Sequence, residues 1–298
     1  MPYFRLQVFY SVAKNLSFTK AAQELFISQP AVTKHINALE DHYQVLLFER
    51  NRGKLALTLA GELMLHHAER ILRDYNNLQY EMHLLHNEHV GQIRLGASTT
   101  IAQYVLPPYL ASYVEEFPKT NISMIHGNSK FIEHSLEQRN IELGLIEGIN
   151  RLPMFTYTPF LEDTLTILTS GNSKIAPHGT LTVEEFKRHP LALREQGSGT
   201  LDAIEQSLLN QHIKISDLNI SIYLGNTEAI KLFTEKTGGL CILSRNAVVN
   251  EVKQGLLRPI EVPGLTFSRS FCFVQAPGPE IPLVYHFMNY IKQQTQHN

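Results

Sequence analysis

The 298-residue sequence has few cysteines, no long apolar run and no large excess of charge of either sign. Its two cysteines, Cys241 and Cys272, lie in apolar runs, so we expect buried, inert thiols rather than a disulfide framework or a redox pair. No stretch approaches the roughly 20 consecutive apolar residues that a membrane helix needs. Arg5, Lys14 and Lys20 interrupt any apolar segment of the secretory-signal type. These absences predict a cytoplasmic protein without membrane contact.

Motifs for catalysis and for metal binding are also missing. The glycine-rich segment 197–200 lacks the Gly-Lys-Ser/Thr ending of a phosphate-binding loop. Gln196 stands where a G-x-S-x-G nucleophile elbow around Ser198 would need glycine. Three histidines recur at every third position, namely His83, His86 and His89. No cysteine or paired carboxylate completes a metal site around them, so a solvated or interface face is favoured. We therefore expect no enzymatic activity, no metal and no cofactor.

The charge is unevenly distributed along the chain. The net charge is −2, yet residues 1–58 contain seven Lys or Arg and four Asp or Glu, which leaves +3 there and −5 on the remainder. A basic N-terminal segment followed by an acidic remainder favours a local contact between that segment and a polyanion. The length suggests two or three domains, and 43% hydrophobic residues are enough to build real cores.

The first 58 residues have the pattern of a winged helix-turn-helix. Apolar side chains at helical spacing predict a helix over 4–14, and Ser17 is a good N-cap for a second helix over 18–26. Ser28 is a cap residue for a third helix, which runs to about Tyr43 with Pro30 in its first turn. Residues 45–58 predict a β-hairpin with its turn at 51–53, and a basic hairpin beside such helices is a wing.

A long helix follows, with Thr58 as its cap and an end near Glu88. Apolar or small residues recur in it at alternating steps of three and four: Gly61, Met64, Ala68, Ile71, Tyr75, Leu78, Met82 and Leu85. This heptad seam predicts pairing with a partner helix, and the alternative is packing on its own domain.

From Gly91 onward, apolar strands alternate with helical segments, which is α/β texture. The number of strands favours two subdomains. We therefore predict a multidomain α+β and α/β fold. Its parts are a DNA-binding domain over 1–58, a linker helix over 59–90 and an α/β domain over 91–298. In the last of these, subdomain I comprises about 91–161 and 266–298, and subdomain II about 162–265.

The candidate DNA-binding residues lie on the third helix and on the wing. Gln29 and Thr33 are four positions apart on one helix face and can address base edges in the major groove. Lys34 and Lys54 suit phosphates, and the wing arginines suit a narrow minor groove. The full set is Ser28, Gln29, Pro30, Thr33, Lys34, Arg50, Arg52 and Lys54. Each residue alone favours a solvated helix, and their joint placement favours double-stranded DNA as a partner.

The runs SFTKAAQELFISQPAVTKHINALE and LLFERNRGKLALTLAG resemble the LysR-type transcriptional regulators. Thr33 and Lys34 stand where Ser and Arg are commoner in that family. The resemblance, weaker through the remaining chain, implies a winged helix-turn-helix, a long linker helix that forms a homodimer, and a two-lobed effector domain shaped like a periplasmic binding protein. It also favours a homotetramer. The REQGSGT and LIEG stretches are similar to the branch that includes regulators of sulfur assimilation and carbon fixation.

Hydroxyl-rich and amide residues follow several strands in the α/β region, at the ends where ligands bind in open sheets. They are Ser98, Thr99, Thr100, Asn128, Gln196, Gly197, Ser198, Gly199, Thr200, Asn226 and Thr227. Taken singly, each segment is explained by helix capping, and together they predict an effector cleft. Neither Ser98–Thr100 nor Gln196–Thr200 contains a lysine or arginine, so binding would rest on neutral donors and helix N-termini.

We therefore expect a small anionic effector, with inorganic sulfur oxyanions or a small carboxylate as the leading candidates. Its binding would favour one closure state of the domain and so change how the dimers sit on DNA. RNA polymerase is a further candidate partner. The alternatives are a solute-binding protein, an enzyme acting on a small anion, and a purely architectural DNA binder.

Overall fold

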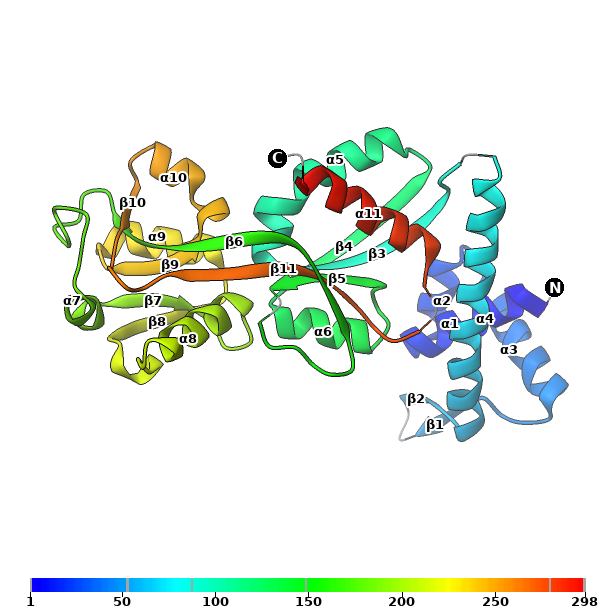
Figure 1. Cartoon of the computed structure of the whole chain (residues 1–298). Coiled ribbons are helices and arrows are strands. Elements are labelled where there is room, and N and C mark those ends of the chain that lie inside the picture. Colours follow the sequence, from blue (N-terminus) through cyan, green and yellow to red (C-terminus); the bar gives the residue numbers. More distant parts are fainter. Residues whose placement is uncertain (1, 52–53, 87, 148, 279, 297–298) are drawn as a thin grey trace. The chain divides into compact units, whose positions relative to one another are not determined.

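The computed structural model describes residues 2–51, 54–86, 88–147, 149–278 and 280–296, and for residues 2, 50 and 51 it describes the backbone only. The chain forms two compact units, Met1–Glu88 and His89–Asn298 (Figure 1). The helix predicted as a separate linker belongs to the first unit. Within the described residues, no helix combines the length and the apolar character that crossing a membrane requires.

The first unit has the helices and the hairpin that the sequence predicted. They are α1 (Pro2–Asn15), α2 (Phe18–Glu24), α3 (Gln29–Tyr43), the antiparallel strands β1 (Phe48–Asn51) and β2 (Lys54–Leu57), and α4 (Leu59–Leu84). Ser17, Ser28 and Thr58 cap α2, α3 and α4, because each side-chain oxygen accepts a hydrogen bond from the backbone N–H three residues further on. The predicted turn residues Arg52 and Gly53 lie outside the described part of the chain.

The second helix is shorter than predicted. It ends at Glu24 rather than at Phe26, because Phe26 adopts a left-handed backbone conformation with φ of 54°. Leu25 forms the C-cap, and its N–H donates to the carbonyl of Ala21. The chain thereby turns sharply before Ser28 starts α3.

Two contacts fix the wing against the helices. The carboxylate of Glu40, near the end of α3, accepts hydrogen bonds from the backbone N–H groups of Leu47 at 2.7 Å and Phe48 at 3.4 Å. Gly61 of α4 lies so close that a Cβ atom there would be 2.1 Å from the carbonyl oxygen of Leu47. The wing therefore starts at a position set by both α3 and α4.

The predicted seam of α4 divides into two parts. Gly61 and Ala68 are buried in the first unit, where Ala68 joins the core that α1, α2 and α3 share. Ile71, Leu78 and Met82 are 52%, 51% and 53% exposed. The first half of the seam packs on its own unit, as the alternative interpretation required, and the second half presents apolar side chains at its surface.

The second unit is built on a mixed sheet with strand order β4-β3-β5-β11-β6-β9-β7-β8, in which β10 also pairs with β6. The strands are β3 (Gly91–Ser98), β4 (Thr120–Gly127), β5 (Leu143–Glu147), β6 (Thr156–Ser170), β7 (Leu191–Arg194), β8 (Ile220–Leu224), β9 (Leu240–Ser244), β10 (Leu257–Ile260) and β11 (Phe267–Gln275). Parallel strands β3, β4 and β5 form lobe I, and parallel strands β7, β8 and β9 form lobe II.

The helices follow the strands in the alternation that the sequence predicted. Lobe I carries a π-helix η1 (Ile101–Val105), α5 (Leu106–Glu116), α6 (Ser129–Glu137) and α11 (Pro282–Gln296). Lobe II carries α7 (Val183–Arg188), α8 (Gly199–Asn210), α9 (Thr227–Thr237), α10 (Val249–Lys253) and short 3₁₀ turns at Ile215–Asp217 and Arg245–Ala247. The last strand that the sequence pattern predicts ends at Ser244, and α10, β10, β11 and α11 were not predicted.

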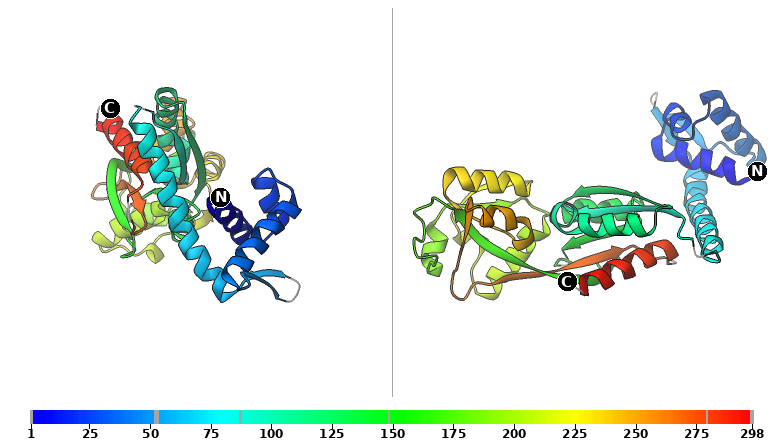
Figure 2. Two further views of the ribbon diagram at one scale, coloured as in Figure 1. Left: turned by 90° about the vertical axis from the view of Figure 1, so that its right-hand side faces the viewer. Right: turned by 90° about the horizontal axis from the view of Figure 1, so that it is seen from above.

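Two long antiparallel strands, β6 and β11, run from one lobe to the other (Figures 1 and 2). Their pairing begins in lobe II, where Phe267 lies opposite Leu165, and ends in lobe I, where Gln275 lies opposite Thr156. The predicted subdomain limit at 161/162 falls inside β6. Both lobes therefore share one sheet, and residues on the crossing strands can bond to either lobe.

Both cysteines are fully buried and form no disulfide, as expected. Burial raises the pKa of Cys241 to about 12, so its thiol stays protonated and unreactive at neutral pH.

Candidate functional site

The exposed start of α3 carries most of the candidate DNA-binding residues of the first unit. Gln29, Pro30 and Lys34 are exposed, and Thr33 is half-buried. The Gln29 amide nitrogen lies 3.3 Å from Thr33 Oγ1, which itself donates to the Gln29 carbonyl at 3.2 Å. The two side chains thus share one helix face, as their spacing predicted.

The wing is described only in part. Lys54 is exposed at the start of β2. Arg50 lies in β1 opposite Leu55, but its side chain lies outside the described part of the structure, as does all of Arg52. The minor-groove role of these two arginines therefore stays a prediction.

Phe26 is a surface feature that the sequence analysis missed. Its side chain is 96% exposed in the turn between α2 and α3, two residues before the Ser28 cap. The alternation of apolar residues placed Phe26 at the end of a helix, and no local signal indicated that it faces outward. It gives the helix-turn-helix an exposed apolar side chain three residues before Gln29.

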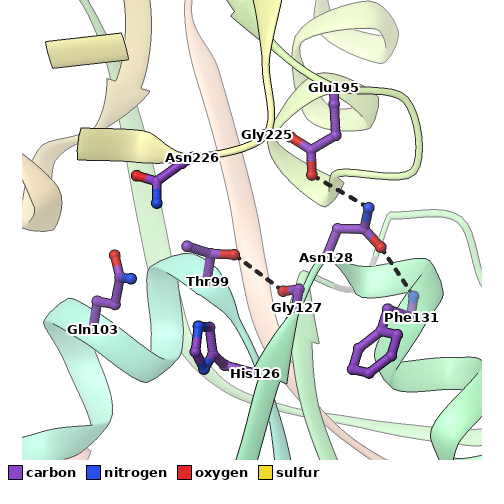
Figure 3. Close-up of a pocket in the computed structure, with 9 residues that line it drawn as sticks. All are labelled: Thr99, Gln103, His126, Gly127, Asn128, Phe131, Glu195, Gly225 and Asn226. Carbon is purple, nitrogen blue, oxygen red and sulfur yellow. Dashed lines mark hydrogen bonds between the residues drawn. The ribbon is translucent and has the colours of Figure 1, made fainter. Parts of the chain in front are cut away.

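A pocket of about 380 Å³ lies between the two lobes of the second unit (Figure 3). Its lining comprises Thr99, Gln103, His126, Gly127, Asn128 and Phe131 of lobe I, and Glu195, Gly225 and Asn226 of lobe II. Thr99, Asn128 and Asn226 were predicted, and the other side chains were not. The signal that could have found Gln103 is its place on the first helical turn after the predicted Ser98–Thr100 segment.

The carboxylate of Glu195 is paired on the pocket wall. Arg194, which is buried, donates from Nε to Oε2 at 2.8 Å and from Nη2 to Oε1 at 3.1 Å. Asn128 Nδ2 adds a hydrogen bond to Oε1 at 3.2 Å, which joins lobe I to lobe II. The wall therefore carries no unbalanced negative charge at this point.

The amide of Asn226 is oriented by its capping role. Its Oδ1 accepts from the backbone N–H groups of Glu228 at 2.7 Å and Ala229 at 3.3 Å, at the start of α9. The oxygen is thereby committed, and the NH₂ group is left to face the pocket (Figure 3). Across the pocket, Thr99 Oγ1 donates to the Gly127 carbonyl at 3.1 Å.

The remaining predicted residues do not belong to this lining within the described structure. Gln196 is exposed, Gly197 is half-buried, and the buried ones are Ser98, Thr100, Ser198, Gly199, Thr200 and Thr227. Ser198 caps α8, and Thr227 Oγ1 accepts from Arg194 Nη1 at 3.3 Å. Most of the predicted hydroxyls thus lie behind the pocket wall and bond to protein groups.

A buried cluster of charged side chains lies directly behind the pocket. Arg269 of β11 donates from Nε to Asp163 Oδ2 at 2.8 Å and from Nη1 to Thr200 Oγ1 at 2.8 Å, and Nη1 lies 3.2 Å from Glu147 Oε1. The three charged side chains are at most 2% exposed. The Gln196–Thr200 segment itself contains no lysine or arginine, but the crossing strand β11 brings Arg269 to Thr200.

Glu147 remains ionised inside this cluster. Burial alone would raise its pKa, but the Arg269 guanidinium and the hydrogen bonds from Ser129 at 2.7 Å and Ser98 at 3.0 Å outweigh burial and lower it. The Nη2 atom of Arg269 is buried and has no hydrogen-bond partner among the described residues. The cluster therefore retains one unused cationic donor.

The lobes contact each other on both sides of the pocket. On one side, the Lys130 N–H of α6 donates to the Gly197 carbonyl at 3.3 Å, and Gly199 lies so near that an added Cβ would be 2.5 Å from the Cβ of Glu147. On the other side, the Tyr104 hydroxyl of η1 bonds to Glu228 of α9. The glycines of the 197–199 segment therefore serve close packing between lobes.

The three spaced histidines do not form a metal site in the described structure. Within the described residues, no group of three or more His, Cys, Asp or Glu side chains could hold a metal ion. His83 lies 3.6 Å from Glu88 in the first unit, and His89 stacks on His286 in the second unit with ring centroids 3.9 Å apart.

A helix-turn-helix with a wing, followed by a two-lobed α/β unit with a pocket between its lobes, defines a ligand-responsive DNA-binding regulator. Two family models match the chain in this order. Residues 4–62 match the bacterial regulatory helix-turn-helix protein, lysR family, and residues 86–296 match the LysR substrate binding domain. The chain therefore belongs to the LysR family of DNA-binding transcriptional regulators, which are not enzymes.

Curated relatives agree with this assignment. The uncharacterized regulator YeiE of Escherichia coli K12 is 32% identical over 87% of this chain and 86% of its own length. The regulator CysL of Bacillus subtilis is 25% identical over 93% of this chain and 92% of its own. A probable RuBisCO transcriptional regulator of Cyanidioschyzon merolae is 28% identical over 92% and 91%. CysL and the RuBisCO regulator match the sulfur-assimilation and carbon-fixation branch that the REQGSGT and LIEG stretches indicated.

Solved structures share the fold. Full-length CbnR complexed with its target DNA has a TM-score of 0.63 at 20% identity, over 98% of this chain and 99% of that one. The Synechocystis CcmR regulatory domain in complex with 2-PG has a TM-score of 0.62 at 21% identity, over 69% of this chain and 98% of that one.

Proposed function

We propose that this regulator responds to a small anion bound in the inter-lobe pocket. The observation that carries the proposal is the donor-rich lining, in which Gln103, His126 and Asn226 present N–H groups while Arg194 neutralises Glu195. The 11-residue helix α9 begins directly after Asn226, and its N-terminus adds partial positive charge. Donors of this kind favour an anion over a cation.

Inorganic sulfur oxyanions or a small carboxylate are the ligands that fit this description. A compact anion can use several donors at once, whereas a large apolar ligand would leave the amides of Gln103 and Asn226 without partners. Arg269, in the buried cluster, adds a positive charge behind the pocket wall, and its Nη2 has no hydrogen-bond partner among the described residues. The structurally similar CcmR domain, solved with 2-PG, supports a small-molecule effector.

The effector would act through the lobe arrangement. An anion held by both lobes adds to the contacts between Tyr104 and Glu228 and between Lys130 and Gly197. It therefore stabilises the closed arrangement by its differential affinity for that state.

The DNA contacts follow from the first unit. α3 enters the major groove, where Gln29 and Thr33 read base edges and Lys34 contacts phosphate. The wing reaches the minor groove and the backbone. The proposed contact residues are Ser28, Gln29, Pro30, Thr33, Lys34, Arg50, Arg52 and Lys54.

The exposed half of the α4 seam is the proposed pairing surface between two subunits, so that two copies of α3 face an interrupted palindrome. Two such dimers form a tetramer in this proposal. RNA polymerase is its further protein partner, and the cytoplasm is where it works.

Calorimetric titration with sulfate, sulfite, thiosulfate, phosphate and acetylated serine tests the effector. Gln103→Leu removes exposed amide donors at nearly constant shape, and it should weaken binding of the active anion about tenfold or more, since a hydrogen bond to a charged group contributes roughly 1.5–3 kcal/mol. Gln92→Leu, at an exposed position outside the pocket, is the matched control. Unchanged affinity in the Gln103 variant, or no binding of any anion, would refute the proposal.

A further inference from the structure

A second pocket, of about 430 Å³, is lined by residues of α7 and of the segment before it. The helix α7 lies at the end of lobe II that is remote from lobe I (Figure 1). Its floor is apolar, with Ile175, Ala176 and Leu181. Its rim carries basic or imidazole side chains, namely Lys174, His178 and His189. This chemistry differs from the inter-lobe pocket, whose lining is mainly amide and hydroxyl.

The walls of this pocket are held rigidly by other parts of lobe II. Arg258 of β10 donates from Nη1 to the Ala176 carbonyl at 3.0 Å and from Nη2 to the Ser173 carbonyl at 3.1 Å, and Nη2 also bonds to the Ile175 carbonyl. One guanidinium thus holds three backbone carbonyls of the pocket loop, those of Ser173, Ile175 and Ala176. Ala176 is 6% exposed and adopts a left-handed φ of 50°, a conformation that L-residues rarely adopt without such support.

The far side of the loop is fixed as well. Leu181 N–H donates to the Glu261 carbonyl at 2.9 Å, and Glu261 N–H donates to the Gly179 carbonyl at 2.8 Å. The pocket is therefore preformed, so a ligand would not have to order the loop when it binds.

The charges at the rim favour an anionic head group. Glu185 is the acidic residue of the lining, but its Oε2 accepts from the Thr182 N–H at 2.8 Å and hydroxyl at 2.7 Å. No hydrogen bond or ion pair within the described residues involves Lys174 or His178. The rim thus has an ammonium and an imidazole without protein partners above a floor of aliphatic side chains.

We propose that this lobe II pocket is a second ligand site, which binds a small monocarboxylate with an apolar body. The carboxylate would bond to Lys174 and His178, and the hydrocarbon would cover Ile175, Ala176 and Leu181. A compact inorganic oxyanion is disfavoured here, because it leaves the aliphatic floor uncovered and meets a single formal cation. The proposal is independent of the effector assigned to the inter-lobe pocket.

Titration of the full-length protein with hexanoate tests this site, with acetate and hexan-1-ol as matched probes that lack the apolar body or the charge. Hexanoate should bind saturably, and at least tenfold more tightly than either matched probe. Lys174→Gln combined with His178→Gln should weaken hexanoate binding tenfold or more and leave the melting temperature unchanged, since both side chains are exposed. Lys236→Gln, at a side chain that is 78% exposed, is the control.

A second variant tests the location of binding. Thr99→Val alters the inter-lobe pocket and should leave hexanoate affinity unchanged, whereas Ile175→Gln should reduce it. The proposal is overturned if hexanoate does not bind, if hexan-1-ol binds equally well, if the double variant binds like the wild type, or if Thr99→Val abolishes the binding.

Discussion

The surface of α3 and the cluster behind the inter-lobe pocket use polar side chains in opposite ways. On α3, Gln29 and Lys34 are exposed and bond to little else, so their donors are available to DNA. Behind the pocket, Glu147, Asp163 and Arg269 are buried and bond to each other and to neighbouring buried hydroxyl groups. Substitutions on α3 should therefore change recognition at little cost in stability, whereas substitutions in the cluster should change stability first.

The largest expected effect is that of Arg269→Met. It leaves two buried carboxylates without their cation, so the free energy of unfolding of the second unit should fall by about 3–5 kcal/mol. Urea unfolding at neutral pH measures the loss, and Arg245→Met, at an exposed arginine, should change stability by less than about 0.5 kcal/mol. If both variants had the same free energy of unfolding, the buried ion pairs of Arg269 would not stabilise the protein.

The pH dependence sharpens this test. Because the pKa of Glu147 is lowered in the folded state, its ionised form stabilises the protein above its unfolded-state pKa, and that contribution is lost as the pH falls through the lowered value. Without Arg269, burial dominates and the carboxylate takes up a proton at higher pH. The difference in free energy of unfolding between the wild type and Arg269→Met should therefore become smaller as the pH falls from about 7 to about 4. A difference in stability that does not change with pH would contradict the ion pair between Arg269 and Glu147.

The same contrast explains what the sequence could predict. The caps Ser17, Ser28 and Thr58 act on backbone groups three residues away, so a local pattern is sufficient to identify them. Arg269 bonds to Asp163 across 106 positions, through the pairing of β11 with β6. No local motif encodes that contact, and the same reason kept Glu147 out of the predicted site.

Among the predicted effector residues, some were identified correctly from local sequence and others were not. Asn128 and Asn226 were predicted because each lies within two residues of the end of a strand, and strand ends meet at the cleft. Thr200 was predicted on the same ground, but its hydroxyl is used by Arg269. The rule for strand ends finds the neighbourhood of a pocket, and the partners of each side chain decide which residues line it.

The next largest effect concerns the two halves of α4. Leu78→Asp places a charge in the exposed half of the seam, where pairing would have to desolvate it without a partner. Sedimentation velocity should then show smaller species, and DNA affinity should fall. Leu63→Asp, at a leucine that is 62% exposed on the same helix outside the seam, should leave the assembly intact. An unaltered assembly in the Leu78 variant would argue against pairing through this seam.

A smaller effect is expected from Gln29→Ala on α3. If Gln29 contacts a base through both amide atoms, its loss should cost roughly 1–3 kcal/mol of discrimination at that base. Binding to specific and scrambled duplexes gives the ratio that reports discrimination. Gln23→Ala, an exposed glutamine on α2, is the matched control and should leave the ratio unchanged. The folded stability of the Gln29 variant should match the wild type, in contrast to Arg269→Met.

The smallest effect is expected from Lys54→Ala on the wing. Lys54 is exposed and can reach phosphate, and no hydrogen bond within the described residues orients it for base reading. Its loss should weaken binding to all sequences about equally and make the log–log salt dependence shallower by about one unit, because one fewer counterion is released. Lys253→Ala, an exposed lysine of the second unit, should change neither quantity. A loss of affinity restricted to the specific duplex would instead show that Lys54 contacts a base. The proposal that α3 reads the bases while Lys54 of the wing contacts only the backbone would then be wrong.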